Sequence, residues 1–425
     1  MFAARVSAAR NVQRVARSFA TAVESSGVKV AAVDNNGPTS SLTVLVKAGS
    51  RYESQAGLAN ALKNYAFKST AKRTALGTVR ESDLYGGVLT STLGREHLAL
   101  TAEFLRGDEA FFLDVLSSFV TSAKFTRHEF QEYVAPLIEG DAAAAASNPA
   151  ILAIELAHLI AFRQGLGASL YAPSHPHFGY KDVQDYASSV FTKDNIAVIG
   201  TNVDQAKVTE LVNKAFASAS SATGPATSAS TYFGGENRIE SSSGLQTAFI
   251  GFGTTGAPSA EVATLAAYLS PSPSIKWSKG TSALAAAIPE GASVQSVYLP
   301  YSDASLVGLL VQAPTAAGVK QAGQAAVQAL KKAASGVSQE ELTSAVAKAK
   351  FAAASAADAR AGLVATIGSK IFSGSDLSVA STLSTFDAVN ASAFSKAASS
   401  LVSSKPTYVA VGEVGSLPYA DELGL

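Results

Sequence analysis

The pattern of apolar and polar positions predicts a chain of alternating strands and helices. Residues 28–33 and 42–47 alternate with a period of two, and residues 35–38 (NNGP) between them are typical of a turn, so we expect an antiparallel pair. Residues 96–102 form another alternating segment. Residues 111–122 carry apolar side chains at helical spacing and predict a helix with one buried face.

The second half of the chain repeats part of this pattern. Residues 186–190, before the apolar strand 196–200, are echoed by residues 397–401, before the strand 408–412. Between the halves, residues 217–232 consist almost entirely of Ala, Ser, Thr, Gly and Pro, a composition typical of a linker. We therefore expect an α+β chain of two homologous domains, each a mixed sheet with helices packed on one face. The predicted limits are 20–216 for the N-terminal domain, 217–235 for the linker and 236–425 for the C-terminal domain.

The amino-acid composition limits the kinds of site that the chain can contain. The chain has 425 residues, of which 47% are hydrophobic and 16% charged, which indicates a globular protein of more than one domain. It contains no cysteine, which excludes disulfides, thiolate metal sites and a thiol nucleophile. The most apolar segment, residues 151–162, contains Glu155 and His158 and is too short for a membrane span, so we interpret it as a buried helix.

The composition of residues 1–19 predicts targeting to mitochondria. Residues 1–19 contain four arginines, and the first acidic residue of the chain is Glu24. A basic, acid-free amphipathic segment is typical of a transit peptide. The alternative is a basic arm that binds nucleic acid. Removing the four arginines leaves 29 basic and 33 acidic residues, a net charge of about −4 by subtraction, which does not favour nucleic-acid binding.

One segment carries a resemblance to a known family. Residues 57–70 (GLANALKNYAFKST) follow the turn at residues 49–54 (GSRYES). Together they resemble the active-site region of the pitrilysin-like metalloproteases, which include the mitochondrial processing peptidases and the core proteins of respiratory complex III. In that family the helix carries His-x-x-Glu-His, two zinc ligands and a general base. Here the three positions are Asn60, Lys63 and Asn64.

The resemblance therefore implies an inactive homologue. An amide is a poor zinc ligand and an ammonium repels a dication, so we expect no catalytic, metal or cofactor-binding residue at these positions. The family's further glutamate ligand would fall near Glu139 or Asp141, without partner ligands. The alternative is an ordinary helix with polar residues at Asn60 and Asn64. The resemblance also implies two domains that enclose a central cavity.

Two kinds of non-catalytic family member fit these features. The substrate-binding subunit of the processing peptidase has a glycine-rich loop in its second domain, where residues 269–281 here have one glycine and two prolines. The second kind is a core protein of ubiquinol–cytochrome c reductase. The resemblance then implies a structural subunit that carries no cofactor and lies on the matrix side of the inner membrane. Its partners would be core protein 1, cytochrome b, cytochrome c1 and the Rieske subunit. The peptidase subunit remains the alternative.

Three histidine-containing positions and one glycine motif are further candidate sites. The sequence His175-Pro176-His177 and the pair His128–Glu129 are weak candidates for metal binding, because no further ligands accompany them. His158 is interpreted as a hydrogen-bonded histidine of the core. Residues 251–256 (GFGTTG) match the dinucleotide-binding glycine pattern, but no acidic residue follows at the required distance, and residues 257–259 resemble a later helix start.

Overall fold

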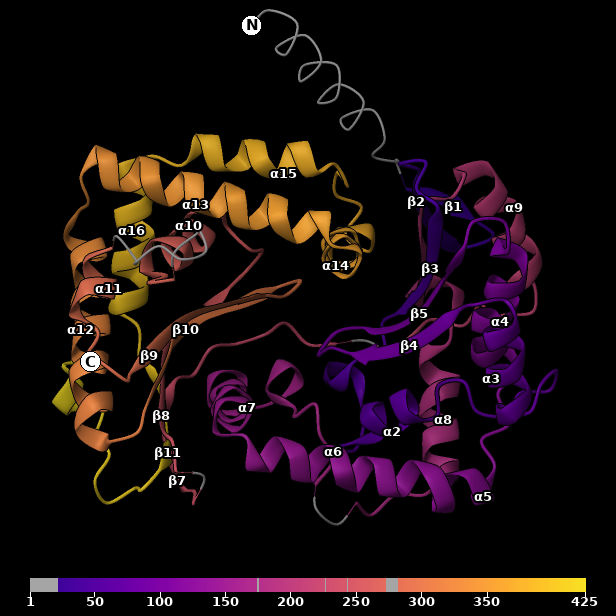
Figure 1. The fold of residues 1–425 in the computed structure, drawn as a ribbon, viewed down its shortest axis with the longest axis horizontal. Helices are drawn as coiled ribbons and strands as arrows, with labels where there is room; N and C mark the ends of the chain where they lie inside the picture. Colours follow the sequence, from indigo (N-terminus) through magenta and orange to yellow (C-terminus); the bar gives the residue numbers. More distant parts are fainter. Residues whose placement is uncertain (1–21, 174–175, 226, 243, 273–281) are drawn as a thin grey trace, which may run out of the picture. The chain divides into compact units, whose positions relative to one another are not determined.

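A computed structural model describes residues 22–173, 176–225, 227–242, 244–272 and 282–425 (Figure 1). The predicted transit peptide, His175 and most of the segment 269–281 lie outside these residues. The described chain forms two compact units. The first comprises residues up to Gly140, Leu170–Thr227 and Ala356–Ser381, and the second comprises Asp141–Ser169, Ser228–Ser355 and Thr382–Leu425. Each unit thus includes a segment from the other half of the sequence. The contiguous limits 20–216 and 236–425 stay a prediction.

The first unit is built on a six-stranded mixed sheet with the strand order β1-β2-β6-β3-β5-β4. Strands β2 and β6 are parallel, and the other neighbours are antiparallel. Strand β6 is buried along its whole length, as expected for a central strand covered on both faces. The strands are β1 (Val23–Ser25), β2 (Val28–Val33), β3 (Thr39–Val46), β4 (Val88–Leu93), β5 (Leu98–Leu105) and β6 (Ile196–Thr201).

The predicted hairpin of residues 28–33 and 42–47 is wrong. Both strands form, but β6 lies between them and pairs with each. Period-two alternation identifies a strand without identifying its neighbour. The connection at residues 34–38 can bridge this gap, because an extended residue spans about 3.5 Å and two strand spacings are about 10 Å.

Helices cover both faces of this sheet. On one face α4, α8 and α9 pack over a core that includes Val44, Leu100, Phe112 and Val198. Strand β5 alternates between buried and more exposed positions, as its sequence predicts. The helices that lie wholly in this unit are α2 (Leu58–Asn64), α3 (Ala75–Leu84), α4 (Glu109–Ser122), α5 (Arg127–Glu129), α8 (Tyr180–Val190), α9 (Gln205–Ala215) and α14 (Arg360–Ile371), and α6 (Ala135–Ser147) begins here.

Helix α14 lies on the opposite face of the sheet and is held at both ends. Gly368 allows close approach, because a Cβ atom there would stand 2.7 Å from Leu45 Cδ2. At the C-terminal end, Lys29 Nζ donates hydrogen bonds of 3.1 Å to the carbonyl oxygens of Ile371 and Phe372. At the N-terminal end, Arg360 Nη1 donates to Glu103 at 3.1 Å. A cation at a helix C-terminus also interacts favourably with the helix dipole.

The second unit has a five-stranded mixed sheet with the order β7-β11-β8-β10-β9. Strand β11 is parallel to β7 and antiparallel to β8, just as β6 is parallel to β2 and antiparallel to β3. Apart from the additional edge strand β1, the two sheets therefore share one strand order, which supports the internal repeat expected from the sequence. The strands are β7 (Gly235–Glu240), β8 (Gln246–Thr255), β9 (Ser293–Pro300), β10 (Ala304–Ala313) and β11 (Thr407–Gly412).

This second sheet is also covered on both faces. Ile250 and Tyr408 face a core formed with α10, α12 and α16, whereas the neighbouring Phe249 and Val409 face α7. Helix α7 presents fully buried alanines at positions 153, 157 and 161, which let its backbone approach the strands closely. The helices here are α7 (Pro149–Phe162), α10 (Ala260–Leu269), α11 (Ala283–Ala287), α12 (Ala316–Ser335) and α16 (Ala391–Val402), and α13 (Gln339–Asp358) and α15 (Val379–Thr385) reach the division between the units.

The expected α+β class with a mixed sheet in each unit is confirmed. The sequence predicted helices on one face of each sheet. The structure adds a helix on the second face, α14 in the first unit and α7 in the second. The expected helix at 57–70 is shorter than predicted: α2 ends at Asn64, and Phe67 has a left-handed φ of 63° that interrupts it. In the described residues no single helix is long and apolar enough to span a membrane. The helices at residues 127–147 and 149–162, which are bent relative to each other, reach the length and composition of a membrane span only when they are taken together.

The contacts of α14 generate a stability prediction. We expect Lys29→Met to lower the free energy of unfolding by about 2 kcal/mol, because two charge-assisted hydrogen bonds to the end of α14 are lost. Denaturant titration of the purified chain measures this. Lys320→Met, which removes an exposed pair with Glu422, is the control and should cost under about 0.5 kcal/mol. Equal effects of the two changes would contradict the assignment.

Candidate functional site

The candidate site is helix α2, which follows β3 through a short, firmly held turn. Arg51 in this turn forms a buried ion pair of 2.8 Å with Glu96, the residue two positions before β5. Gly49 packs directly on the backbone, since a Cβ atom there would stand 2.2 Å from Arg95 O. The turn therefore fixes where α2 begins relative to the sheet.

Glu53 and Gly57 start the helix. Gly57 is the N-cap residue with a left-handed φ of 96°, a conformation that favours glycine. The Glu53 carboxylate accepts hydrogen bonds from the backbone N–H groups of Gly57 at 3.2 Å and Ala59 at 3.0 Å. Burial raises the pKa of Glu53 to about 7, and these two backbone hydrogen bonds oppose the rise.

The three positions of the degenerate motif lie together on α2. Asn60 is 2% exposed, and its Oδ1 accepts a hydrogen bond of 3.1 Å from Asn64 Nδ2, one turn further along. The carbonyl of Lys63 accepts from Ser91 Oγ on β4 at 3.3 Å. The two amides therefore occupy the places of an i, i+4 ligand pair and bond to each other.

The chemistry of these side chains does not suit zinc. Zinc sites in proteins are made from imidazole, thiolate and carboxylate groups. Among the described residues no group of three or more His, Cys, Asp or Glu side chains could hold a metal ion. Of the two acidic positions considered as a further ligand, Glu139 is exposed on α6 and Asp141 is half-buried on the same helix.

The structure gives contacts for two of the histidine candidates, His158 and His128. His158 is 1% exposed; its Nδ1 lies 2.7 Å from Ile154 O and its Nε2 2.7 Å from the Tyr301 hydroxyl. The interpretation as a hydrogen-bonded core histidine is confirmed. His128 pairs with Glu132 at 3.0 Å on the surface, whereas Glu129 accepts from Ser69 N at 2.9 Å. The proposed pair His128–Glu129 is therefore divided between two different contacts.

The glycine motif at 251–256 does not form a phosphate-binding turn. Gly251 and Gly253 lie inside strand β8, and the next helix, α10, begins at Ala260 after an N-cap at Ser259. Gly253 leaves room for an aromatic ring, because a Cβ atom there would stand 2.3 Å from Tyr232 Cδ2. Gly251 and Gly253 therefore serve packing, Gly256 has a left-handed φ of 98°, and the expected helix start at residues 257–259 is confirmed.

Comparison with known proteins agrees with this geometry. Residues 29–174 match the family model of insulinase (peptidase family M16). A fungal protein from Cryptococcus neoformans var. grubii, named cytochrome b-c1 complex subunit 2, mitochondrial, is 43% identical over 99% of this chain and 98% of its own. Proteins of the same name from Yarrowia lipolytica and Homo sapiens are 38% and 28% identical, over 97% and 93% of this chain and 99% and 90% of their own.

The family-model match to residues 29–174, the part of the chain that contains α2, indicates the peptidase M16 class. More particularly, the chain belongs to the family of cytochrome b-c1 complex subunit 2, mitochondrial. The resemblance of residues 49–70 to this class is thereby confirmed. Glu53 was not singled out from the sequence, although an acidic residue shortly before a helix start is a recognisable signal.

The buried carboxyl of Glu53 generates a pH prediction. Its pKa is raised from 4.5 to about 7 on folding, so its ionisation opposes folding, and stability falls as pH rises from about 4.5 through about 7. We expect Glu53→Gln, which cannot ionise, to remove this loss and exceed the original chain in stability at pH 8. The gain is on the order of 3 kcal/mol at most. Denaturant unfolding curves of the two chains at about pH 4.5 and at pH 8 measure this difference in stability.

The control for Glu53 is Glu290→Gln, at an exposed turn, which should change little at either pH. A Glu53→Gln chain whose stability follows the same pH profile as the original would contradict the assignment.

The site also generates a metal prediction. We expect the purified chain to contain well below one zinc atom per molecule after dialysis against zinc, because two amides and an ammonium occupy the ligand positions. The triple variant Asn60→His, Lys63→Glu, Asn64→His supplies two imidazoles and a carboxylate and should retain more zinc. Elemental analysis measures both. Stoichiometric zinc in the original chain that is lost in Asn60→Ala would refute this expectation.

Proposed function

We propose that this chain is the non-catalytic core subunit 2 of the mitochondrial ubiquinol–cytochrome c reductase, the cytochrome b-c1 complex, and that it is needed for assembly and stability of the complex. The observation that carries the proposal is similarity along the whole length. Relatives that bear this subunit's name match 97% to 99% of the chain at 38% to 43% identity.

The absence of peptidase activity is part of the proposal. A zinc peptidase of this class needs two imidazoles to hold the metal and a carboxylate to activate water. Asn60, Lys63 and Asn64 supply none of these groups, and Asn60 is buried with its amide bonded to Asn64. What remains of the site is a short helix fixed by Glu53 and Gly57.

The proposed partners are core protein 1, cytochrome b, cytochrome c1 and the Rieske subunit. The proposed location is the matrix side of the inner membrane, reached through the basic leader at residues 1–19 and held through other subunits. Obligate complexes of this kind bury on the order of 2,000–5,000 Å² per interface, enough to make the stability of the partners interdependent.

The second candidate is the substrate-binding subunit of the processing peptidase. That role depends on a flexible glycine-rich loop, whereas residues 269–281 contain one glycine and two prolines. The relatives named above carry the name of a cytochrome b-c1 subunit. We therefore favour the structural role.

Deletion of the gene separates the two functions. We expect loss of the chain to deplete cytochrome b, core protein 1 and quinol–cytochrome c reductase activity together, because subunits without their interfaces are unstable. Cleavage of matrix presequences should continue. The measurements are haem spectra, reductase assays and immunoblots of precursor proteins, with re-expression of the original chain as the control.

Early accumulation of uncleaved precursors, with cytochrome b-c1 activity intact, would refute the proposal and favour the peptidase subunit.

A further inference from the structure

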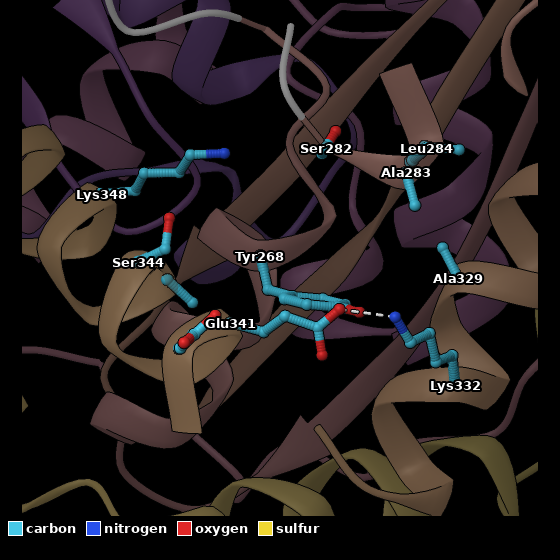
Figure 2. A pocket seen from close by; sticks show the side chains of 11 residues that line it. Tyr268, Ser282, Ala283, Leu284, Ala329, Lys332, Glu341, Ser344 and Lys348 are labelled. Atoms are coloured by element: carbon cyan, nitrogen blue, oxygen red, sulfur yellow. Dashed lines mark hydrogen bonds and ion pairs between the residues drawn. The ribbon is translucent and has the colours of Figure 1, made fainter. Parts of the chain in front are cut away.

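The second unit contains a pocket of its own. Its volume is about 300 Å³, and residues of α10, α11, α12 and α13 line it (Figure 2). Tyr268, Leu284, Ala329 and Ala345 provide apolar wall. This volume lies at the lower end of the range for small-molecule sites, which are mostly apolar with a few placed polar groups.

On one side of the pocket the charged side chains are paired with each other. Lys332 Nζ lies 2.5 Å from Glu341 Oε1, and Glu341 Oε2 also accepts from the backbone N–H of Ser338 at 3.0 Å. Figure 2 shows this ion pair beside the ring of Tyr268. These two charges neutralise each other and do not call for a ligand.

The other side carries a charge without a counterpart. Lys348 is half-buried on α13, and among the described residues it has no ion-pair partner. The remaining residues cannot supply one, because residues 1–21, 174–175, 226, 243 and 273–281 contain no Asp or Glu. Figure 2 places Lys348 and Lys332 on opposite sides of Tyr268, so the Glu341 carboxylate serves Lys332.

The pocket thus combines an apolar wall with Lys348, a half-buried cation that forms no ion pair among the described residues. Ser344, one helical turn before Lys348, adds a hydroxyl to the same side. Glu340 also lines the pocket, but its side chain is exposed, so water and salt screen its charge. An ammonium without an ion-pair partner gains from a carboxylate that brings a charge-assisted hydrogen bond.

We propose that this pocket binds a small amphipathic monocarboxylate, a molecule with a short apolar chain and one carboxylate. The carboxylate pairs with Lys348 and accepts from Ser344, while the apolar chain lies against Tyr268, Leu284 and Ala329. The binding is reversible and involves no covalent step. It does not depend on the proposed role in the cytochrome b-c1 complex.

The probe is octanoate carrying carbon-13 at its carboxyl, titrated into the full mature chain and followed by NMR and calorimetry. We expect one saturable site. Lys348→Gln should bind about tenfold more weakly, because the ion pair is lost, and Lys348→Arg should bind within about threefold of the original chain. Ala329→Phe should abolish binding by filling the pocket. Octylamine, which has the same chain and the opposite charge, should not bind.

Lys396→Gln, an exposed lysine on α16 of the same unit, is the matched control and should leave the affinity unchanged. Circular dichroism of each variant verifies folding. Failure of octanoate to bind the original chain, or equal affinity in Lys348→Gln and Lys396→Gln, would overturn the proposal. So would binding of an acidic peptide at Lys348 in the absence of octanoate binding, since the pocket would then be a protein-docking site.

Discussion

The constraint on which the structure depends is the burial of central strands on both faces. Strands β6 and β11 are buried at every position, so each sheet needs a helical layer on either side. One layer comes from helices near in sequence. The second comes from a distant helix: α14 in the first unit and α7 in the second. Neither contiguous half of the sequence therefore contains all the layers of its unit.

This constraint explains how much of the fold could be predicted from the sequence. Strands and helices with clear periodicity, such as residues 28–33 and 111–122, form as expected. Strand neighbours could not be predicted, because alternation in β2 and β3 carries no information about the insertion of β6. Helix α2 ends at Asn64, and the left-handed backbone at Phe67 keeps it from continuing to residue 70, a conformation that a non-glycine residue does not signal in the sequence.

The candidate site could be located from the sequence, but its supporting contacts could not. The spacing around residues 49–70 identified α2 and its three altered positions. The hydrogen bond between Asn60 and Asn64 and the capping role of Glu53 depend on burial and helix geometry. The pocket beside Tyr268 was also beyond prediction, because its residues come from four helices that only the fold brings together.

The central claim is that the chain is a structural subunit whose peptidase chemistry has been lost. The most direct measurement is affinity purification of the tagged chain from detergent-solubilised mitochondrial membranes, followed by quantitative mass spectrometry and haem spectroscopy. The account predicts cytochrome b, cytochrome c1, the Rieske subunit and core protein 1 in stoichiometric amounts. Recovery of a catalytic processing-peptidase subunit at stoichiometric level, without haem, would contradict it.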